Sequence, residues 1–583
     1  MPRQGLEIVR FRERYYNIVT VKSTLINPNP KALGARIIAS IPADPEEYQT
    51  WLKQMRAKYA DRQKELEEHV YEIRDGSWPD CSCFNDLRGL PSEFLQLHGF
   101  DLNEDYFFII NLDREVFTIN FGIHWKLGNI PRSNGLWYKS AKPSIYWFQL
   151  TVSLDICPDE YIGSPALELP EPDGKLGYPF RLVAPKTDIS EARKVFLTRI
   201  LAKVIYQYKD NIIRVGMEWS PASFPFRELI FALVSIASGG AKFFSFPSQA
   251  CNPRDCPFLW CESDHLPPSC GFLDREWAGN HAPLLEFGSM SHRPGDAPGV
   301  APPETMYWVE DVLVSLSMNV DGEAITRAVA WGFGQGRKNF QIVVLSLFEA
   351  NFAEVYFRDS DDKEPMIKVS NPVYLSPLRQ RYCMSTHPRE RPAHKGNTYY
   401  WKPHGEKLME SNCTGTARQL QSIFPGLAAL VNFFEVAANR RVSSISAGIF
   451  SLELYDLILD FVDYDTWKTC TAVSTGFRSS CLRKYRIDDE TRILKRPIVR
   501  CERMRSGRPE PVLSFQFENI KTGNVLHAIE CDSPGITKEL NWMPLIGSDR
   551  KALMLDVVVQ FEPAEGINKC QKKTNARTAC RLT

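Results

Sequence analysis

The stretch of this chain that decides the fold around it reads Phe450-Ser451-Leu452-Glu453-Leu454-Tyr455-Asp456-Leu457-Ile458-Leu459-Asp460-Phe461-Val462. Its apolar side chains recur three and four residues apart, which is the spacing of one wide helix face. They are Leu454, Leu457, Ile458, Phe461 and Val462. Ser451 is suited to cap this helix, and Glu453 lies where negative charge favours the positive helix end. We therefore predict a short amphipathic helix.

A second helix is predicted directly after the first. Asp465 would cap it through its carboxylate, and Trp467, Cys470 and Val473 would lie on one side of it. A segment of about 40 residues cannot bury enough apolar surface to be stable by itself. Its apolar faces must therefore pack into the interior of this chain or against another protein.

The order of these residues resembles the F-box, a three-helix module that docks on the Skp-type adaptor of cullin-RING ubiquitin ligases. An F-box usually opens with a Leu-Pro pair, whereas this chain has Phe450-Ser451, so one helix-start signal is missing. We place the F-box-like module at 445–490. The resemblance rests on Glu453-Leu454, Ile458-Leu459, Val473-Ser474 and Phe477-Arg478.

The resemblance implies a substrate receptor, which recruits an unknown target protein to the ligase and is not itself an enzyme. Its partners would be the Skp-type adaptor, the cullin-RING ligase and that target. Two alternatives stay open: a non-catalytic interaction scaffold whose F-box-like helices are internal packing, and an N-terminal enzyme domain that no motif reveals. The expected adaptor-binding residues are Leu454, Leu457, Ile458, Phe461, Trp467 and Val473.

Composition favours a folded protein of the cytosol or nucleus. The 583 residues are 44% hydrophobic and 24% charged, which is ordinary for a globular protein. Lys plus Arg equals Asp plus Glu at 70 each, so no overall charge attracts nucleic acid or an acidic membrane. We find no apolar stretch typical of a signal peptide or a membrane span. The 15 cysteines are odd in number and scattered, which favours reduced thiols.

The length and the mixture of patterns predict an α+β, multidomain protein. A long helix should begin with Asp44 as its cap, Pro45 in the first turn and Glu47 at the third position. Two runs rich in β-branched and aromatic residues, 106–110 and 116–119, flank a polar turn and predict a β-hairpin. These features define an N-terminal α+β domain at 1–165.

The N-terminal domain has a second, weaker resemblance. The Arg12 to Tyr16 run, the Asp-Pro-Glu helix start, the hairpin and the segment 124–132 are similar to parts of uncharacterised F-box-like proteins of filamentous fungi. That kinship implies no chemistry. Asp113, Glu115 and His124 could serve as acids and bases, but hairpin geometry does not bring them together, so we predict no catalytic residue.

Further boundaries follow from turn-rich segments and from changes of periodicity. Ser443 to Ser446 should connect a helix to the F-box-like module. We predict a helical block with a Cys-containing loop at 180–285, a linker at 286–304, a mixed α+β region at 305–440, a C-terminal β domain at 497–563 and a basic disordered tail at 565–583.

A cysteine-rich loop is the best candidate for a metal site. The spacing of its thiols matches no recognised zinc knuckle and prolines interrupt it, so we favour free thiols and predict no metal or cofactor. The candidate ligands are Cys251, Cys256, Cys261, His265 and Cys270.

Two further segments are candidate binding sites for phosphate or nucleic acid. Gly332 to Arg337 lacks the lysine of a phosphate-binding loop and predicts a flexible turn. The basic and aromatic segment 386–407 predicts an exposed loop rather than a nucleic-acid site.

Overall fold

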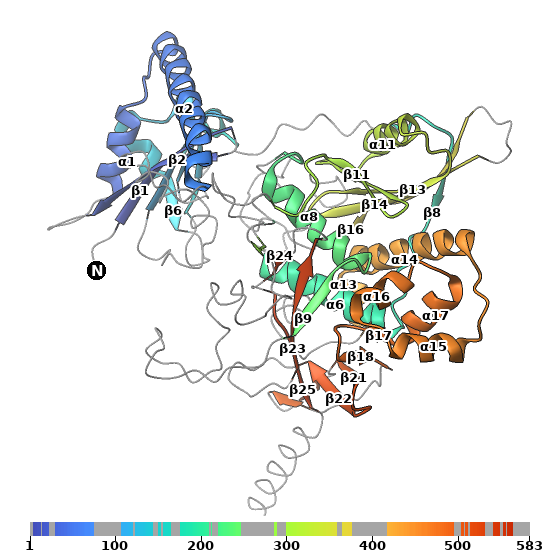
Figure 1. Ribbon diagram of the computed structural model, residues 1–583. Coiled ribbons are helices and arrows are strands. Elements are labelled where there is room, and N and C mark those ends of the chain that lie inside the picture. The colour runs from blue at the N-terminus through green and yellow to red at the C-terminus, as the bar shows by residue number, and fades with distance from the viewer. Residues whose placement is uncertain are drawn as a thin grey trace, which may run out of the picture.

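Helices and several separate sheets make up the protein in its computed structural model, which is the α+β class that the sequence predicts (Figure 1). The structure describes residues 4–12, 14–22, 30–74, 106–119, 123–143, 150–152, 156–164, 175–208, 212, 220–245, 285–287, 299–357, 364–375, 417–494, 503–505, 508–510, 513–530, 540–547, 552–554 and 557–563. The cysteine-rich loop 251–270, the segment 386–407 and the tail 565–583 lie outside these ranges. Within them, no helix combines the length and apolar character that a membrane crossing requires.

The N-terminal sheet has the strand order β2-β1-β3-β4-β5, and β3 and β4 form the predicted hairpin. Its strands are β1 (Gln4–Phe11), β2 (Arg14–Lys22), β3 (Tyr106–Asn111), β4 (Val116–Ile119) and β5 (Ile123–Lys126). Helices α1 (Pro30–Ala39) and α2 (Pro45–Arg74) share a core with this sheet, in which Tyr48 and Leu52 join Trp125. Shorter elements follow: η2 (Leu127–Asn129), η3 (Ser133–Gly135), α5 (Leu136–Lys139), β6 (Ala141–Pro143), β7 (Leu150–Val152) and η4 (Asp159–Tyr161).

Helix α2 begins as predicted. The Asp44 carboxylate accepts hydrogen bonds from the backbone N–H groups of Glu46 and Glu47, each at 3.0 Å, which satisfies donors at the free helix end. Farther along, the guanidinium of Arg56 pairs with Glu115 in the hairpin turn at 3.1 Å. This turn charge therefore fastens α2 to the hairpin.

A second sheet has the order β11-β12-β13-β14-β15-β8, with β16 paired to β14. Its strands are β8 (Phe180–Val183), β11 (Met306–Val309), β12 (Val312–Leu316), β13 (Phe340–Leu345), β14 (Glu349–Tyr356), β15 (Met366–Ser370) and β16 (Val373–Tyr374). Helix α11 (Gly322–Gly334) covers one face, and a Cβ at Gly332 would lie 2.3 Å from the Phe340 ring. Gly336, with a φ of 77°, follows the helix, so the predicted flexible turn is the end of α11.

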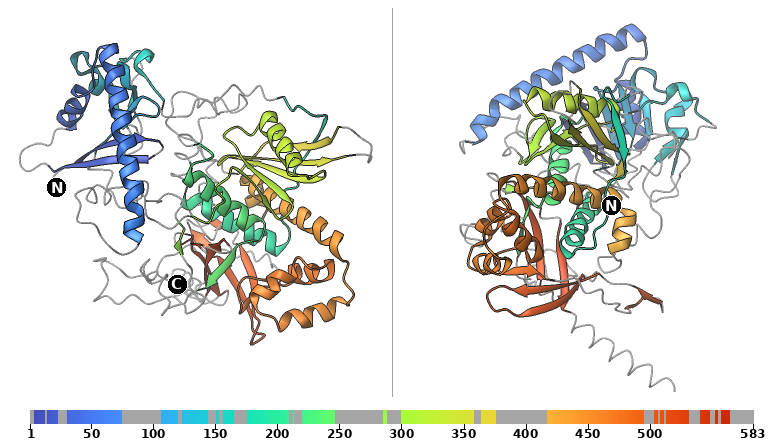
Figure 2. Two further views of the ribbon diagram at one scale, coloured as in Figure 1. Left: turned by 45° about the horizontal axis from the view of Figure 1, so that its top comes forward. Right: turned by 90° about the vertical axis from the view of Figure 1, so that its right-hand side faces the viewer.

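A layer of helices packs against the other face of the second sheet and shares its core (Figure 2). These helices are α6 (Ala192–Gln207), α8 (Phe224–Ala237), α13 (Ala417–Ile423) and α14 (Pro425–Ile445). Helices α6 and α8 lie within the helical block that the sequence predicts at 180–285. Helix α14 continues to Ile445, so Ser443 and Ser444 belong to its last turn rather than to a connection.

A third sheet lies beyond the helix layer, with the order β10-β24-β23-β25-β22-β21-β18-β17 and with β9 paired to β23 (Figure 2). Its strands are β9 (Lys242–Ser245), β10 (Leu285–Glu286), β17 (Tyr485–Arg486), β18 (Thr491–Ile493), β21 (Ser514–Asn519), β22 (Val525–Glu530), β23 (Leu540–Ile546), β24 (Ala552–Leu553) and β25 (Val559–Pro563). Strands β19 (Arg503–Arg505) and β20 (Arg508–Glu510) form a separate hairpin.

The sheets join segments that the sequence predicts as separate blocks. Strand β8, from 180–285, pairs with β15, from 305–440, and β9 pairs with β23, from 497–563. The described end of the predicted linker is also fixed, because the backbone N–H of Ala301 donates to Glu228 on α8 at 2.8 Å. Pairing between strands far apart in the sequence leaves no local periodicity, so turn-rich segments do not mark where folded units end.

The N-terminal sheet should lose stability in mild acid because of His124. Burial lowers the pKa of this imidazole from 6.5 to about 4, and its Nδ1 lies 3.0 Å from the Thr118 hydroxyl. The folded state favours neutral histidine, so this stability is complete above pH 6.5 and is lost as the pH falls towards 4. Between pH 7 and pH 5 the free energy of unfolding should fall by roughly 2 kcal/mol.

Hydrogen exchange of the β4 and β5 amides, corrected for intrinsic rates, measures this loss at each pH. The variant His124→Asn keeps a polar group beside Thr118 without a titrating ring, so its protection should change less over the same range. Equal acid sensitivity in both proteins would contradict the assignment to His124.

Candidate functional site

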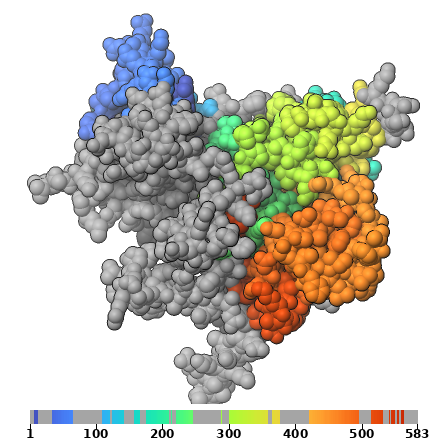
Figure 3. Space-filling view, viewed as in Figure 1, coloured from blue at the N-terminus to red at the C-terminus, as the bar shows by residue number. Residues whose placement is uncertain are grey.

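Three short helices follow α14 and form a unit that we call the helical module, residues 449–485. They are α15 (Leu452–Asp460), α16 (Tyr464–Cys470) and α17 (Thr475–Arg483). Helix α17 packs on α14, α15 and α16. In Figure 3 the orange region, which contains the helical module, is exposed between the yellow-green region of the second sheet and the red region of the third sheet. The module therefore lies at the surface while it is fastened to the helix layer.

The helix starts in the module follow from short polar side chains. Asp463 caps α16, because its carboxylate accepts a hydrogen bond from the Thr466 N–H at 2.7 Å. The helix thus begins before Asp465, the residue expected to cap it. Ser474 caps α17 in the same way. Ser451 occupies the capping position of α15, but its side chain makes no capping hydrogen bond.

Tyr455 fixes the inner face of α15. Its ring lies 4.5 Å from that of Phe477 on α17, between centroids, and its hydroxyl accepts a hydrogen bond from the Phe450 N–H at 3.1 Å. Gly476 allows this close approach, since a Cβ there would lie 2.2 Å from the Tyr455 ring. Leu459 is buried on the same side. One side of α15 is thus internal packing.

Trp467 does not belong to the exposed surface, which corrects its expected role as an adaptor-binding residue. Only 2% of it is exposed, and its ring stacks on Tyr464 at 5.7 Å and meets Tyr485 at 5.6 Å. It lies in the large core that the helix layer shares with both neighbouring sheets. The tryptophan faces inward because α16 packs against α17 and the strand that follows it.

The outer side of the helical module is apolar and exposed. Leu457 is 55% exposed and Phe461, directly after α15, is 88% exposed. Unlike the tryptophan, the other expected residues Leu454, Ile458 and Val473 are also exposed. Helix α15 is therefore apolar on two sides, of which its own chain covers one.

Three further apolar side chains near the start of α15 are exposed in addition to the residues expected from the sequence. Ile449, Phe450 and Leu452 are exposed immediately before and at the start of α15. Helical periodicity could not reveal Ile449 and Phe450, because they precede the helix. Their one sequence signal is apolar character beside a predicted helix start. We call the whole set the α15 surface, and its members are Ile449, Phe450, Leu452, Leu454, Leu457, Ile458, Phe461 and Val473.

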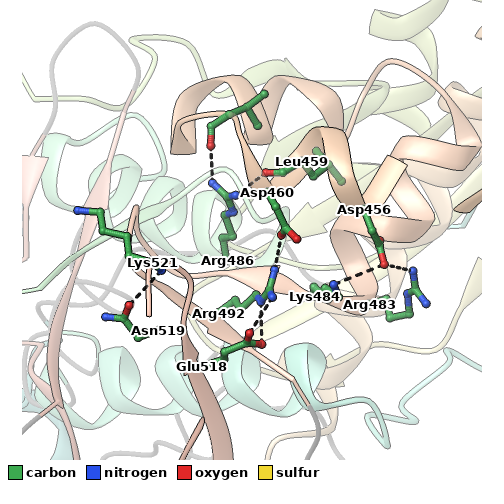
Figure 4. Close-up of polar contacts among 11 residues, drawn as sticks. Asp456, Leu459, Asp460, Arg483, Lys484, Arg486, Arg492, Glu518, Asn519 and Lys521 are labelled. Carbon is green, nitrogen blue, oxygen red and sulfur yellow. Dashed lines mark hydrogen bonds and ion pairs between the residues drawn. The ribbon is translucent and has the colours of Figure 1, made fainter. Parts of the chain in front are cut away.

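Buried arginines hold the end of α15 against the third sheet (Figure 4). The Arg492 guanidinium, on β18, pairs with Asp460 at the end of α15 and with both carboxylate oxygens of Glu518 on β21, at 3.0 and 2.9 Å. Arg486 donates to the carbonyl oxygens of Leu459 and Val462, the latter at 2.7 Å. These bonds occupy carbonyl groups that are free at a helix end, and they fix the direction of α15.

Lys468 fastens the helical module to the turn between α8 and β9. Its ammonium donates to the carbonyl oxygens of Gly240 and Ala241, the latter at 2.8 Å. Burial, and then the nearby positive charge of Lys242, lower the pKa of Lys468 to about 7, while Glu310 opposes the shift. The group serves packing between elements, since backbone carbonyls take its hydrogen bonds.

The groups considered for catalysis do not converge. Asp113 pairs with Arg10 at 3.8 Å, while Glu115 and His124 have the separate partners described above. Over the described ranges, no three His, Cys, Asp or Glu side chains gather as a metal site would require.

The Arg492 contacts yield a stability prediction. Arg492→Met should raise the exchange rate of the α15 amides by an amount equivalent to about 3 kcal/mol, because it leaves Glu518 and Asp460 without their shared cation. Arg483→Met is the matched control, since Arg483 is half exposed in its ion pair with Asp456 and should cost less than about 1 kcal/mol. Hydrogen exchange read by mass spectrometry measures both variants. Equal effects would show that Arg492 does not hold α15.

Comparison with protein-family models, curated proteins and solved structures finds no match to this chain. The site is characterised by its own geometry. That geometry is a helix with one side packed in the core and an apolar side in solvent.

Proposed function

We propose that the protein is an F-box-like substrate receptor whose α15 surface docks on a Skp-type adaptor of a cullin-RING ubiquitin ligase. The observation that carries the proposal is the exposure of Leu454, Leu457 and Phe461 on a helix whose other side is buried. Contiguous apolar side chains in solvent are costly and mark sites where another protein binds. The F-box resemblance of the sequence supplies the class of partner.

The helical module supports docking because its geometry is set before a partner arrives. Tyr455 and Arg492 hold the inner side and the end of α15, so few backbone torsions need to be ordered on binding. An apolar groove on the adaptor would then receive the outer side of α15. A few side chains of α15 would contribute most of the binding free energy. Phe461, the most exposed of the expected residues, is the best anchor.

In this proposal the remaining chain selects a target protein, and the ligase subunits perform the chemistry. The receptor contributes proximity between the target and the transferred ubiquitin. Such a receptor would work in the cytosol or nucleus. No catalytic constellation is required of this chain.

The alternative is an interaction scaffold without a link to a ligase, with the F-box-like helices as internal packing. Burial of Tyr455, Leu459 and Trp467 supports internal packing for one side of the module. The exposed residues of the α15 surface favour docking for the other side. The two functions differ in the partner, so the adaptor itself is the discriminating reagent.

Two substitutions on α15 test the proposal. Leu454→Asp combined with Leu457→Asp should weaken binding to a recombinant Skp-type adaptor, bound to the N-terminal part of a cullin, at least tenfold. The reason is that a charge replaces each anchor of about 2 kcal/mol, while both side chains are exposed and the fold should persist. Biolayer interferometry with the full chain gives the dissociation constants.

Phe180→Asp combined with Leu182→Asp is the matched control, because it makes the same chemical change at exposed apolar side chains on β8, outside the module. This control should bind the adaptor as the wild type does. Absence of adaptor binding by the wild type, or unchanged binding by the folded α15 variant, would rule out the docking role and leave the scaffold function.

A further inference from the structure

Strand β8 ends the second sheet and is exposed along its outer edge. In Figure 1 it lies at the margin of that sheet, and its one described neighbour in the strand order is β15. Among the residues that the structure describes, no strand pairs with its outer side. An open edge presents unpaired backbone groups and is a template for strand addition.

The register with β15 shows which backbone groups of β8 face outward. The carbonyl oxygen of Pro179 accepts a hydrogen bond from the Ile367 N–H at 3.0 Å, so this position faces β15. Backbone groups alternate sides along a strand, so Arg181 also faces β15. The N–H and C=O groups of Phe180 and Leu182 therefore point away from the sheet.

The side chains of Phe180 and Leu182 end a row of apolar side chains that crosses the sheet, and no further strand covers them in the described part of the chain. Ile367 and Val369 on β15 are buried under the α11 side of the sheet, and their direct neighbours on β8 are Phe180 and Leu182. Phe180 is 52% exposed and Leu182 is 59% exposed. A further strand with apolar side chains opposite them would continue the row and cover both.

A row of charges on the opposite face is incomplete as well. Glu354 on β14, Lys368 on β15 and Arg181 on β8 are direct neighbours across the strands. Glu354 pairs with Lys368 at 3.1 Å and with Arg440 on α14 at 2.6 Å, so its charge is already shared. Arg181 is exposed beside the positive Lys368, and in the described part of the chain no acidic side chain forms an ion pair with it. The next position outward therefore favours a carboxylate.

We propose that β8 binds an extended peptide segment of another protein by strand addition, and that this segment carries an Asp or Glu between two apolar residues. Its backbone would pair with the outward groups of Phe180 and Leu182, its apolar side chains would cover theirs, and its carboxylate would pair with Arg181. A second copy of this chain fits less well, because antiparallel pairing centred on Arg181 would place two guanidinium groups opposite each other.

Peptide binding at β8 stands on the geometry of the second sheet. Only its interpretation as target recruitment rests on the proposed receptor function. A receptor needs a site for its target that is separate from the surface for its adaptor. Strand β8 lies outside the helical module and meets this requirement.

Fluorescence anisotropy with the full chain tests the proposal. The probes are two labelled peptides, Thr-Val-Glu-Val-Thr and Thr-Val-Lys-Val-Thr. The wild type should bind the Glu peptide at least tenfold more tightly than the Lys peptide, and Arg181→Glu should reverse this preference. Leu182→Pro should abolish binding of the Glu peptide, because proline removes an outward N–H without removing a hydrogen bond to β15.

Three results would overturn the proposal: failure of the wild type to bind the Glu peptide, unchanged binding by folded Leu182→Pro, or a dimer in light scattering that Leu182→Pro dissociates. The last result would assign the edge to a second copy. Adaptor binding, measured on the same variants, separates the two proposals. Loss of peptide binding in folded Leu182→Pro supports the β8 site whether or not the protein binds the adaptor.

Discussion

The contact of Phe196 with the third sheet is the interaction on which the packing of the helix layer, and of the helical module fastened to it, depends. Phe196 lies on α6. The centroid of its ring is 5.3 Å from that of Phe243, 6.0 Å from that of Phe515 and 6.3 Å from that of Phe561. Aromatic rings bury large areas, so this cluster fixes the helix layer on the sheet. Helix α14 packs on α6, and the helical module packs on α14. The position of the helical module thus depends on packing with helices that are far away in the sequence.

A helix that is apolar on two sides is stable in water only when one side is held firmly. For α15, Tyr455 fills a space that Gly476 leaves open, and Arg492 and Arg486 occupy the polar groups at its end. These contacts compensate for the cost of leaving leucine and phenylalanine side chains in solvent. The α15 surface is therefore present on the folded protein before any partner binds. Burial of this surface by a partner would stabilise the complex without the cost of first ordering the helix.

Helix α14 connects the two surfaces to which we assign partners. Its C-terminal end leads into the helical module, while Arg440 in its last turns pairs with Glu354 in the sheet that ends at β8. A receptor must hold its target at a defined position relative to its adaptor, because proximity is its contribution to the reaction. A packed helix that contacts both regions provides such a position better than a flexible linker would.

The sequence by itself determined the local elements: the α2 start at Asp44, the hairpin of β3 and β4, and the apolar outer side of α15. Hydrogen bonds of helix caps and the periodicity of side chains depend on residues that are neighbours in the chain. Only the tertiary structure decided that Trp467 is buried, that β8 joins β15 and that β9 joins β23. Burial and strand pairing depend on which distant segment packs against a residue, and no local pattern encodes that partner.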